Sequence, residues 1–306
     1  MTEGRDTPAF KAGYVAIVGE PNVGKSTLMN ALLQQKISIV TKKPQTTRQR
    51  VLGIATDEES QMIFLDTPGL LEPRYLLHEK MLQVALRALE DADVILVMTE
   101  PSWGTQLPDQ VKNHVLSIPS SKPIVLCINK ADTVARDTLL PLIDNFSRMK
   151  HFRDIVPVSA LRGENLGTLR SVLKKLLSPH PAFYPEDSLS EQPERFFASE
   201  LIREAIFEQF QEEIPYSTAV EIREFKEREE GKTYINADIV VERDSQKGIL
   251  IGKKGAALKR IGQTARIRIE EFIQRPVFLD LHVKVGEGWR SKESWMKRLG
   301  YEPEPN

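Results

Sequence analysis

Residues 19–26, GEPNVGKS, have the types and the spacing of a loop that binds the phosphates of a nucleotide. Gly19 and Gly24 allow the backbone to curl so that its N–H groups face the β-phosphate, and Lys25 adds a charge between the β- and γ-phosphates. Ser26 offers a hydroxyl to Mg²⁺, and the N-terminus of the following helix favours an anion. A chance match recurs in roughly one chain in a hundred of this length. The apolar run before the loop and the helix-like stretch after it make chance a weaker explanation.

A second group, DTPG at residues 66–69, follows the apolar run MIFL. Asp66 is placed to hold Mg²⁺ through water, and the Gly69 N–H is placed to sense the γ-phosphate. The third group is TTR at residues 46–48, where we favour Thr47 over Thr46 as a Mg²⁺ ligand that binds only when the γ-phosphate is present. The predicted metal ligands are therefore Ser26, Thr47 and Asp66. An ordinary turn or loop is the alternative for both groups.

NKAD at residues 129–132 stands at the end of the apolar run IVLCINK and predicts a guanine site. Guanine presents two donors, N1–H and the 2-amino group, and an ionised carboxylate such as Asp132 accepts both. Adenine has an unprotonated N1 and no 2-amino group, so Asp132 would reject it. Asn129 would fix the loop and reach the base, and the stem of Lys130 would cover the ring. Residues 159–161, SAL, would add a backbone N–H near guanine O6.

We expect the following residues to contact the nucleotide: Gly19, Glu20, Pro21, Asn22, Val23, Gly24, Lys25, Ser26, Thr27, Asp66, Thr67, Pro68, Gly69, Leu70, Asn129, Lys130, Asp132, Ser159 and Ala160. The residues predicted to take part in catalysis are Asn22, Lys25, Thr47, Asp66 and Gly69.

The elements that must position these residues are short apolar runs at residues 14–19, 62–69, 94–100, 124–130 and 155–160. They are rich in Val and Ile and alternate with helix-like stretches, which predicts an α/β domain with a doubly wound, mostly parallel sheet. Four prolines lie between residues 178 and 195 and favour an extended linker. We therefore divide the chain into a nucleotide-binding domain at 1–177, a linker at 178–195 and a second domain with a tail at 196–306.

The second domain has the pattern α-β-β-α-α-β, and its basic residues gather in its last part. Residues 182–242 hold six Lys and Arg against 16 Asp and Glu, whereas residues 243–298 hold 14 against six. We expect one helix at 248–262, GILIGKKGAALKRIG, with Ile249 and Ile251 in the core. Two solvated lysines at a helix start are the alternative to a phosphate grip. The separation of basic from acidic residues favours a loop that binds the phosphates of a nucleic acid. The residues predicted to contact RNA are Ile251, Gly252, Lys253, Lys254, Gly255, Lys259 and Arg260.

Composition excludes several other classes of protein. The single cysteine, Cys127, cannot form an internal disulfide, and the five histidines do not have the spacing of metal ligands. No apolar run reaches the roughly 18 residues of a membrane-spanning helix, and the polar N-terminus lacks the apolar stretch of a signal peptide. The expected location is the cytoplasm.

The five nucleotide motifs in this order resemble those of bacterial GTPases of the translation-factor-related class, and in particular the Era-type branch. In that family a type II KH domain follows the GTPase domain, and IGKKG at residues 251–255 takes the position of its G-x-x-G loop. The resemblance covers residues 12 to 301. Glu20 stands where arginine is frequent in this family, and Thr99 with Glu100 replaces a more usual aspartate.

The resemblance implies a slow GTPase that converts GTP to GDP, binds the 3′ end of 16S rRNA and acts in assembly of the small ribosomal subunit. It also implies a monomer and peripheral association with the inner membrane, for which the sequence offers no lipid anchor. Leu70 stands where many small GTPases place a glutamine that orients water, so turnover in isolation should be slow. In related enzymes with PNVGKS the asparagine, here Asn22, helps to hold K⁺ beside the β- and γ-phosphates. A structural role for Asn22 in the loop is the alternative.

Two other functions compete with this hypothesis. A GTPase that assists tRNA modification would need a catalytic cysteine or a cofactor site, and Cys127 lies inside an apolar run. An RNA-binding module with vestigial hydrolysis would not need Lys25, Ser26 and Asp66, all of which are present.

Overall fold

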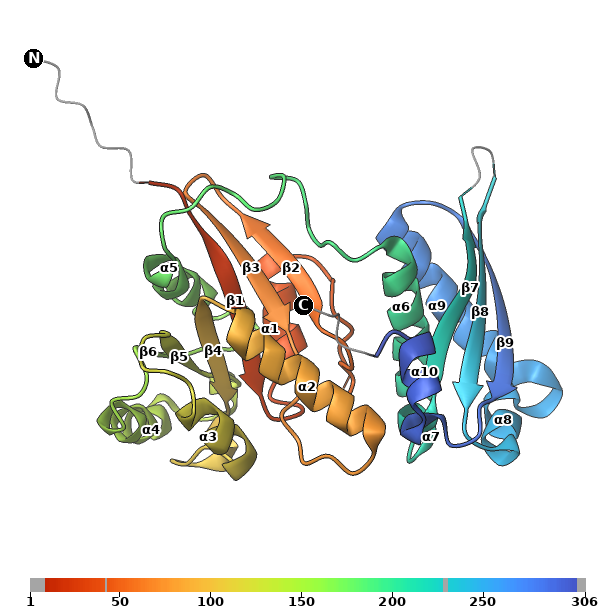
Figure 1. Ribbon diagram of the computed structural model, residues 1–306, viewed down its shortest axis with the longest axis horizontal. Coiled ribbons are helices and arrows are strands. Elements are labelled where there is room, and N and C mark those ends of the chain that lie inside the picture. Colours follow the sequence, from red (N-terminus) through yellow and green to blue (C-terminus); the bar gives the residue numbers. More distant parts are fainter. Residues whose placement is uncertain (1–8, 42, 228–230, 302–306) are drawn as a thin grey trace, which may run out of the picture. The chain divides into compact units, whose positions relative to one another are not determined.

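The predicted phosphate and base loops belong to one of two units into which the protein divides. The computed structural model describes residues 9–41, 43–227 and 231–301, so the polar leader at 1–8 and the end of the tail at 302–306 lie outside the described residues. The first unit comprises Met1–Ser38, Gln49–Glu72 and Leu82–Glu191, and the second comprises Ile39–Arg48, Pro73–Met81 and Gln192–Asn306 (Figure 1).

A six-stranded sheet forms the centre of the first unit. Its order is β2-β3-β1-β4-β5-β6, and all neighbours are parallel except the antiparallel pair β2 and β3. The central strands are buried on both faces, which explains their nearly continuous apolar sequences. The predicted fold class is confirmed. The strands are β1 (Lys11–Gly19), β2 (Val51–Thr56), β3 (Ser60–Asp66), β4 (Val94–Thr99), β5 (Ile124–Ile128) and β6 (Asp154–Pro157).

Strand β2 was not among the predicted strands. Gly53 interrupts its apolar run, which weakens the sequence signal for a strand. The structure shows why a glycine is suited to this position: a Cβ there would lie 2.4 Å from Leu33 Cδ1, so β2 approaches the helix α1 (Lys25–Leu33) closely.

Helices cover the sheet and leave the predicted loops at the carboxyl ends of the parallel strands. Apolar residues such as Ala88, Val111 and Phe146 share one core cluster with alternate residues of the strands. Ligands of open α/β sheets bind at this edge. These helices are α2 (Leu76–Asp91), α3 (Asp109–Leu116), α4 (Arg136–Arg148) and α5 (Leu166–Leu176), with short 3-10 turns η1 (Pro101–Trp103) and η2 (Ala131–Thr133).

Most of the predicted linker packs within the first unit. Gln61 Oε1 accepts hydrogen bonds from the N–H groups of Phe183 (2.8 Å) and Tyr184 (3.0 Å), and the Ile54 N–H donates to the Leu189 carbonyl (2.9 Å). The units divide between Glu191 and Gln192. The extended conformation that the prolines favour therefore lets the chain run across β2 and β3.

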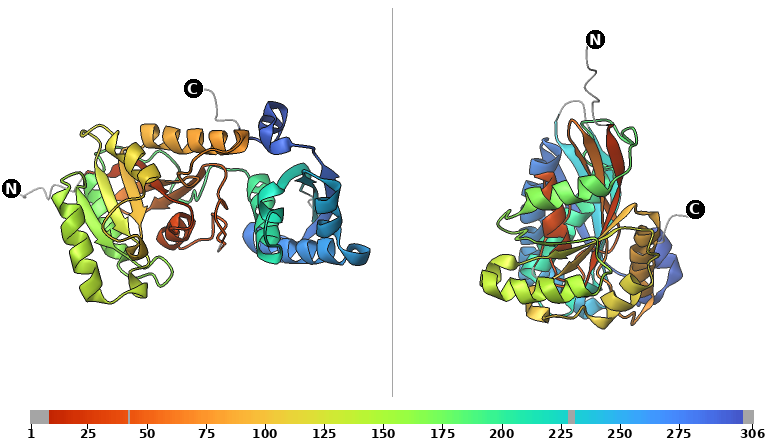
Figure 2. Two further views of the ribbon diagram at one scale, coloured as in Figure 1. Left: turned by 90° about the horizontal axis from the view of Figure 1, so that it is seen from below. Right: turned by 90° about the vertical axis from the view of Figure 1, so that its left-hand side faces the viewer.

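The second unit is built on a three-stranded sheet, with the order β7-β8-β9. Strands β7 and β8 are antiparallel, and β8 and β9 are parallel. Helices α6 and α9 contact each other and the sheet (Figure 2). The elements are α6 (Glu194–Gln209), α7 (Ile214–Ser217), β7 (Ala219–Lys226), β8 (Thr233–Val241), α8 (Asp244–Ile251), η3 (Lys253–Gly255), α9 (Ala256–Ile273), β9 (Val277–Val285), η4 (Trp289–Ser291) and α10 (Glu293–Arg298). The predicted α-β-β-α-α-β order is present, with α7, η4 and α10 in addition.

The prediction of one helix over residues 248–262 is wrong, because the helices break inside it. Helix α8 ends at Ile251 and α9 begins at Ala256. Gly252, Lys254 and Gly255 have φ values of 70°, 52° and 78°, which a right-handed helix cannot accommodate. The core assignment is wrong for Ile249, which is 49% exposed. Ile251 is partly buried and packs against the core cluster of the second unit, and Leu250 between them is fully buried.

The segment Ile39–Arg48 packs within the second unit. The Arg48 guanidinium is 3% exposed and donates to the carbonyls of Thr218 (2.6 Å), Pro215 (3.1 Å) and Tyr216 (3.0 Å). Arg203, equally buried, donates to the Thr46 carbonyl at 2.7 Å. Over the described residues, no helix is long and apolar enough to cross a membrane.

Candidate functional sites

The phosphate-binding loop connects β1 to α1, and its glycines allow close approaches. Gly24 has a φ of 99°, and a Cβ there would lie 2.4 Å from Asn129 Nδ2. Lys25 is 6% exposed, and its ammonium donates to the carbonyls of Gly19 (3.2 Å) and Glu20 (2.9 Å). Burial lowers the pKa of Lys25 to about 8, although Asp66 and Glu20 act in the opposite direction. A phosphate at this position would offset that burial cost.

Two of the three predicted metal ligands lie together in the first unit. Ser26 Oγ donates to Asp66 Oδ2 at 2.7 Å, and a hydroxyl with a carboxylate is an oxygen donor set that suits Mg²⁺. The described residues include no group of three or more His, Cys, Asp or Glu that could hold a metal. Most ligands of a metal here would therefore be phosphate and water oxygens, as is usual for Mg²⁺. Thr47, the third predicted ligand, belongs to the second unit.

The DTPG turn packs directly against the phosphate-binding loop. A Cβ on Gly69 would lie 2.7 Å from Pro21 N, and the Leu70 N–H donates to the Gly19 carbonyl at 3.1 Å. Thr67 Oγ1 donates to the Ile17 carbonyl (2.8 Å), so this hydroxyl has a structural partner. Leu70 is 1% exposed and belongs to the core cluster of the first unit. Its side chain is apolar and buried, so it cannot orient a water molecule.

Asn129 connects three of the predicted loops. Its Nδ2 donates to the Val23 carbonyl (2.8 Å) in the phosphate-binding loop, and its Oδ1 accepts from the Ala160 N–H (3.0 Å). Because this side chain is 3% exposed, both bonds are shielded from water. The base loops that follow β5 and β6 are thereby fixed to each other and to the loop that follows β1.

Two charged residues that the sequence did not assign to the site pair with the NKAD motif. Glu100, at the end of β4, forms an ion pair with Lys130. Arg162 forms one with Asp132, with Nε 3.2 Å from Oδ2. The sequence marks Glu100 only as a departure from the family pattern. Arg162 gives no signal in the sequence, because its contact with Asp132 depends on the folded loop.

The GKKG loop presents its two lysines at a tight bend between α8 and α9. Lys253 and Lys254 are exposed, as are Lys259 and Arg260 in the first turns of α9. The Gly252 N–H donates to the Gly248 carbonyl (2.9 Å), and the Gly255 N–H donates to the Gly252 carbonyl (3.1 Å). The backbone of the bend is therefore hydrogen-bonded, while the lysine side chains extend into solvent.

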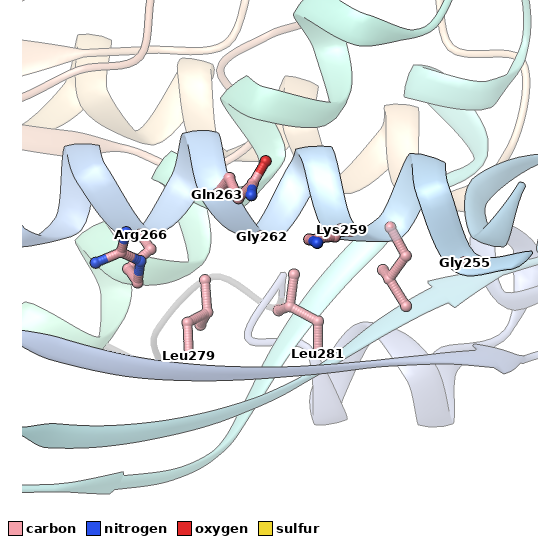
Figure 3. A pocket seen from close by; sticks show the side chains of 8 residues that line it. Gly255, Lys259, Gly262, Gln263, Arg266, Leu279 and Leu281 are labelled. Atoms are coloured by element: carbon pink, nitrogen blue, oxygen red, sulfur yellow. The ribbon is translucent and has the colours of Figure 1, made fainter.

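A groove of about 400 Å³ begins at this bend and runs between α9 and β9 (Figure 3). Its floor is apolar, and three polar side chains stand along α9. Such a groove beside a basic loop can accept bases while the loop holds their phosphates. The lining residues are Gly255, Leu258, Lys259, Gly262, Gln263, Arg266, Leu279 and Leu281. Only Gly255 and Lys259 were predicted. The residues of β9 are distant from the loop in the sequence and come close to it only in the folded domain.

Cys127 does not support a nucleophilic role. It is fully buried in β5, and burial raises the pKa of its thiol far above the usual range. A catalytic thiolate requires the opposite environment.

Two parts of the chain match family profiles, and together they define a GTPase domain followed by a KH domain. Residues 14–130 match a family described as 50S ribosome-binding GTPase, and residues 213–290 match the KH domain. The order of these matches along the chain is the order in which the sequence motifs occur.

Whole-chain relatives give the particular family. The chain is 44% identical to GTPase Era of Geobacter metallireducens, over 97% of this chain and 99% of that protein. It is 40% identical to GTPase Era of Ruminiclostridium cellulolyticum, over 97% of this chain and all of that protein. The protein belongs to the Era family of GTPases, which confirms the resemblance, and it is a GTPase.

Two solved structures are also similar to this chain. One is Era in complex with MgGDPNP and nucleotides 1506–1542 of 16S ribosomal RNA, with a TM-score of 0.92 and 41% identity. The other is a single-substitution variant of Aquifex aeolicus Era bound to GDP·AlF4⁻, also with a TM-score of 0.92 and 41% identity. Each comparison covers 96% of this chain and all of the other.

Proposed function

We propose that this GTPase is a switch that binds the 3′ end of 16S rRNA and acts in assembly of the small ribosomal subunit. The single observation that carries the proposal is the presence, in one chain, of a guanine-type base loop and a basic G-x-x-G bend that opens onto a groove. The relative solved with MgGDPNP and 16S rRNA supports both halves of this proposal. The expected place of action is the cytoplasm, and the expected form is a monomer, with peripheral association at the inner membrane as a further expectation.

In the proposed nucleotide site, Lys25 contacts the β- and γ-phosphates, and Ser26 and Asp66 hold Mg²⁺. Bound Mg²⁺ neutralises charge that develops on the phosphates. The Gly69 N–H faces the γ-phosphate, and Asp132 accepts from the guanine edge. Because Leu70 is buried and apolar, water must be positioned by other groups, and turnover of the isolated protein should be slow.

We further propose that Asn22 holds K⁺ beside the β- and γ-phosphates. Asn22 has a φ of 66°, in the left-handed region that asparagine adopts more readily than most other residues. An added cation would support hydrolysis as an arginine finger does, although by less than the finger's roughly 10³- to 10⁵-fold effect. Hydrolysis should therefore be faster in KCl than in NaCl of the same concentration, and equal rates would exclude the ion.

Phosphate release with and without small ribosomal subunits tests the main proposal. Subunits should change the turnover of the wild-type protein, because binding of the RNA is coupled to the nucleotide state. A module with vestigial hydrolysis would release no phosphate under either condition. A GTPase of tRNA modification would release phosphate at a rate that small subunits leave unchanged.

A further inference from the structure

Arg162 lies against the carboxylate that the proposed guanine site needs. Its Nε is 3.2 Å from Asp132 Oδ2, and the Asp132 side chain is only 10% exposed. The Arg162 side chain is 60% exposed, so it can leave this position without losing a packed environment. Both residues belong to the first unit, and their loops follow β6 and β5.

The loop that carries Arg162 is closed at its base. Ser159 and Glu164 exchange two backbone hydrogen bonds, of 3.2 and 3.0 Å, and form an isolated antiparallel bridge. The Arg162 N–H donates to Ser159 Oγ at 3.2 Å. The Ala160 N–H is tied to Asn129 Oδ1, in the motif that contains Asp132. The backbone thus holds Arg162 within reach of Asp132.

Arginine and guanine offer the same chemistry to this carboxylate. The guanine edge presents N1–H and the 2-amino group from a planar N–C–N unit, and the guanidinium presents N–H donors from a unit of the same kind. An aspartate accepts either set. Glu164 contacts the same guanidinium at the same time, because its Oε1 is 3.9 Å from Arg162 Nη1.

We propose that Arg162 competes with guanine for Asp132 and thereby lowers the affinity of the protein for guanine nucleotides. The inference rests on the proposed guanine site. Guanine can take the carboxylate only in the fraction of molecules whose Arg162 has moved away, and this fraction scales the apparent affinity. An ion pair in which one partner is exposed reduces that fraction by a factor of about 1.5 to 5.

Stopped-flow binding of GDP with a fluorescent label on its ribose tests the competition. Arg162→Ala should associate about 1.5 to 5 times faster than wild type, with an unchanged dissociation rate. The ratio of the Arg162→Ala rate to the wild-type rate should approach one as salt weakens the ion pair. The control is Arg148→Ala, which removes one positive charge and the Arg148–Asp144 ion pair within α4.

Other outcomes identify which idea has failed. Slower or unchanged association of Arg162→Ala overturns the competition. If Arg162 merely attracted the anionic nucleotide, its removal would slow association. IDP lacks the 2-amino group, and competition in the free protein scales IDP and GDP equally. A changed ratio of IDP to GDP affinity in Arg162→Ala would therefore show direct contact with the base instead. If Asp132→Ala binds GDP as wild type does, the proposed guanine site itself is wrong.

Discussion

At the scale of single residues, the nucleotide site depends on side chains that hold loops as much as on those that would face the ligand. Asn129 is the main example, because one amide joins the loops after β1, β5 and β6. The motif predicted that Asn129 fixes its loop, but it could not name the carbonyl of Val23 as a partner. Contacts of this kind, like that of Arg162 with Asp132, depend on how loops distant in sequence meet.

Guanine specificity should rest on Asp132. In Asp132→Asn an amide faces two donors and can accept from only one of them. Loss of about two charged hydrogen bonds should weaken GTP binding by roughly 10²- to 10⁴-fold. Xanthine has a carbonyl at position 2 and should suit the amide better, so XTP binding should increase. Equilibrium titration with GTP and XTP measures this change of specificity. An unchanged affinity for GTP would show that Asp132 does not recognise guanine.

Nucleotide affinity should depend on pH through Lys25. Burial lowers its pKa to about 8, so a growing fraction of the ligand-free protein is neutral at this position above that pH. Because phosphate binds the charged form, binding takes up protons, and the affinity falls as the pH rises. From about pH 7 to about pH 8.5 the dissociation constant of GDP should increase about four-fold. Calorimetry in buffers of different ionisation enthalpy would detect the protons taken up when GDP binds. Zero proton uptake near pH 8 would refute the lowered pKa of Lys25.

At the scale of elements, the sequence predicted the strands and helices with strong patterns and missed those set by local conformation. The five predicted apolar runs are strands, because buried parallel strands need continuous apolar residues. Strand β2 was missed because Gly53 weakens its pattern. The helix break at Gly252–Gly255 was missed because apolar periodicity continues on both sides of it. Two glycines so close together, at the first and last positions of GKKG, are the signal that could have shown the break.

Alanine substitutions at Gly252 and Gly262 should have different effects on stability and on RNA binding. Gly252 has a φ of 70°, and a Cβ there would lie 2.7 Å from Ala257 Cβ. Gly252→Ala should therefore lower the free energy of unfolding by about 1–3 kcal/mol. Gly262 lies within α9, where alanine is favoured by up to about 1 kcal/mol, and its new methyl group would enter the groove 3.5 Å from Leu281 Cδ1.

Chemical denaturation and RNA titration of both variants test this difference. Gly262→Ala should be as stable as wild type or more stable, and it should bind the RNA more weakly. Wild-type RNA affinity in a stable Gly262→Ala protein would show that the groove does not hold bases. A Gly252→Ala protein as stable as wild type would contradict the geometry of the bend.

At the scale of the whole molecule, the GEPNVGKS, DTPG and NKAD motifs lie in the first unit, and the GKKG bend lies in the second. The net charge of the chain is −1, yet residues 243–298 hold 14 Lys and Arg against six Asp and Glu. The sequence revealed this division, because composition and motif order do not depend on side-chain geometry. It did not reveal that Ile39–Arg48, with its buried Arg48, packs within the second unit.

The central claim, that the GKKG bend binds the phosphates of RNA, is tested most directly by one titration. The ligand is a short oligonucleotide of the 16S rRNA 3′ end, and the proteins are wild type and the double variant Lys253→Asp with Lys254→Asp. The glycines remain, so the bend can form, while two attractive phosphate contacts become repulsive. We predict that the variant loses RNA binding and retains GTP binding and basal hydrolysis. Wild-type binding should weaken with salt, with a slope of about −0.7 per phosphate contact. Binding of the oligonucleotide by the variant with wild-type affinity would contradict the account.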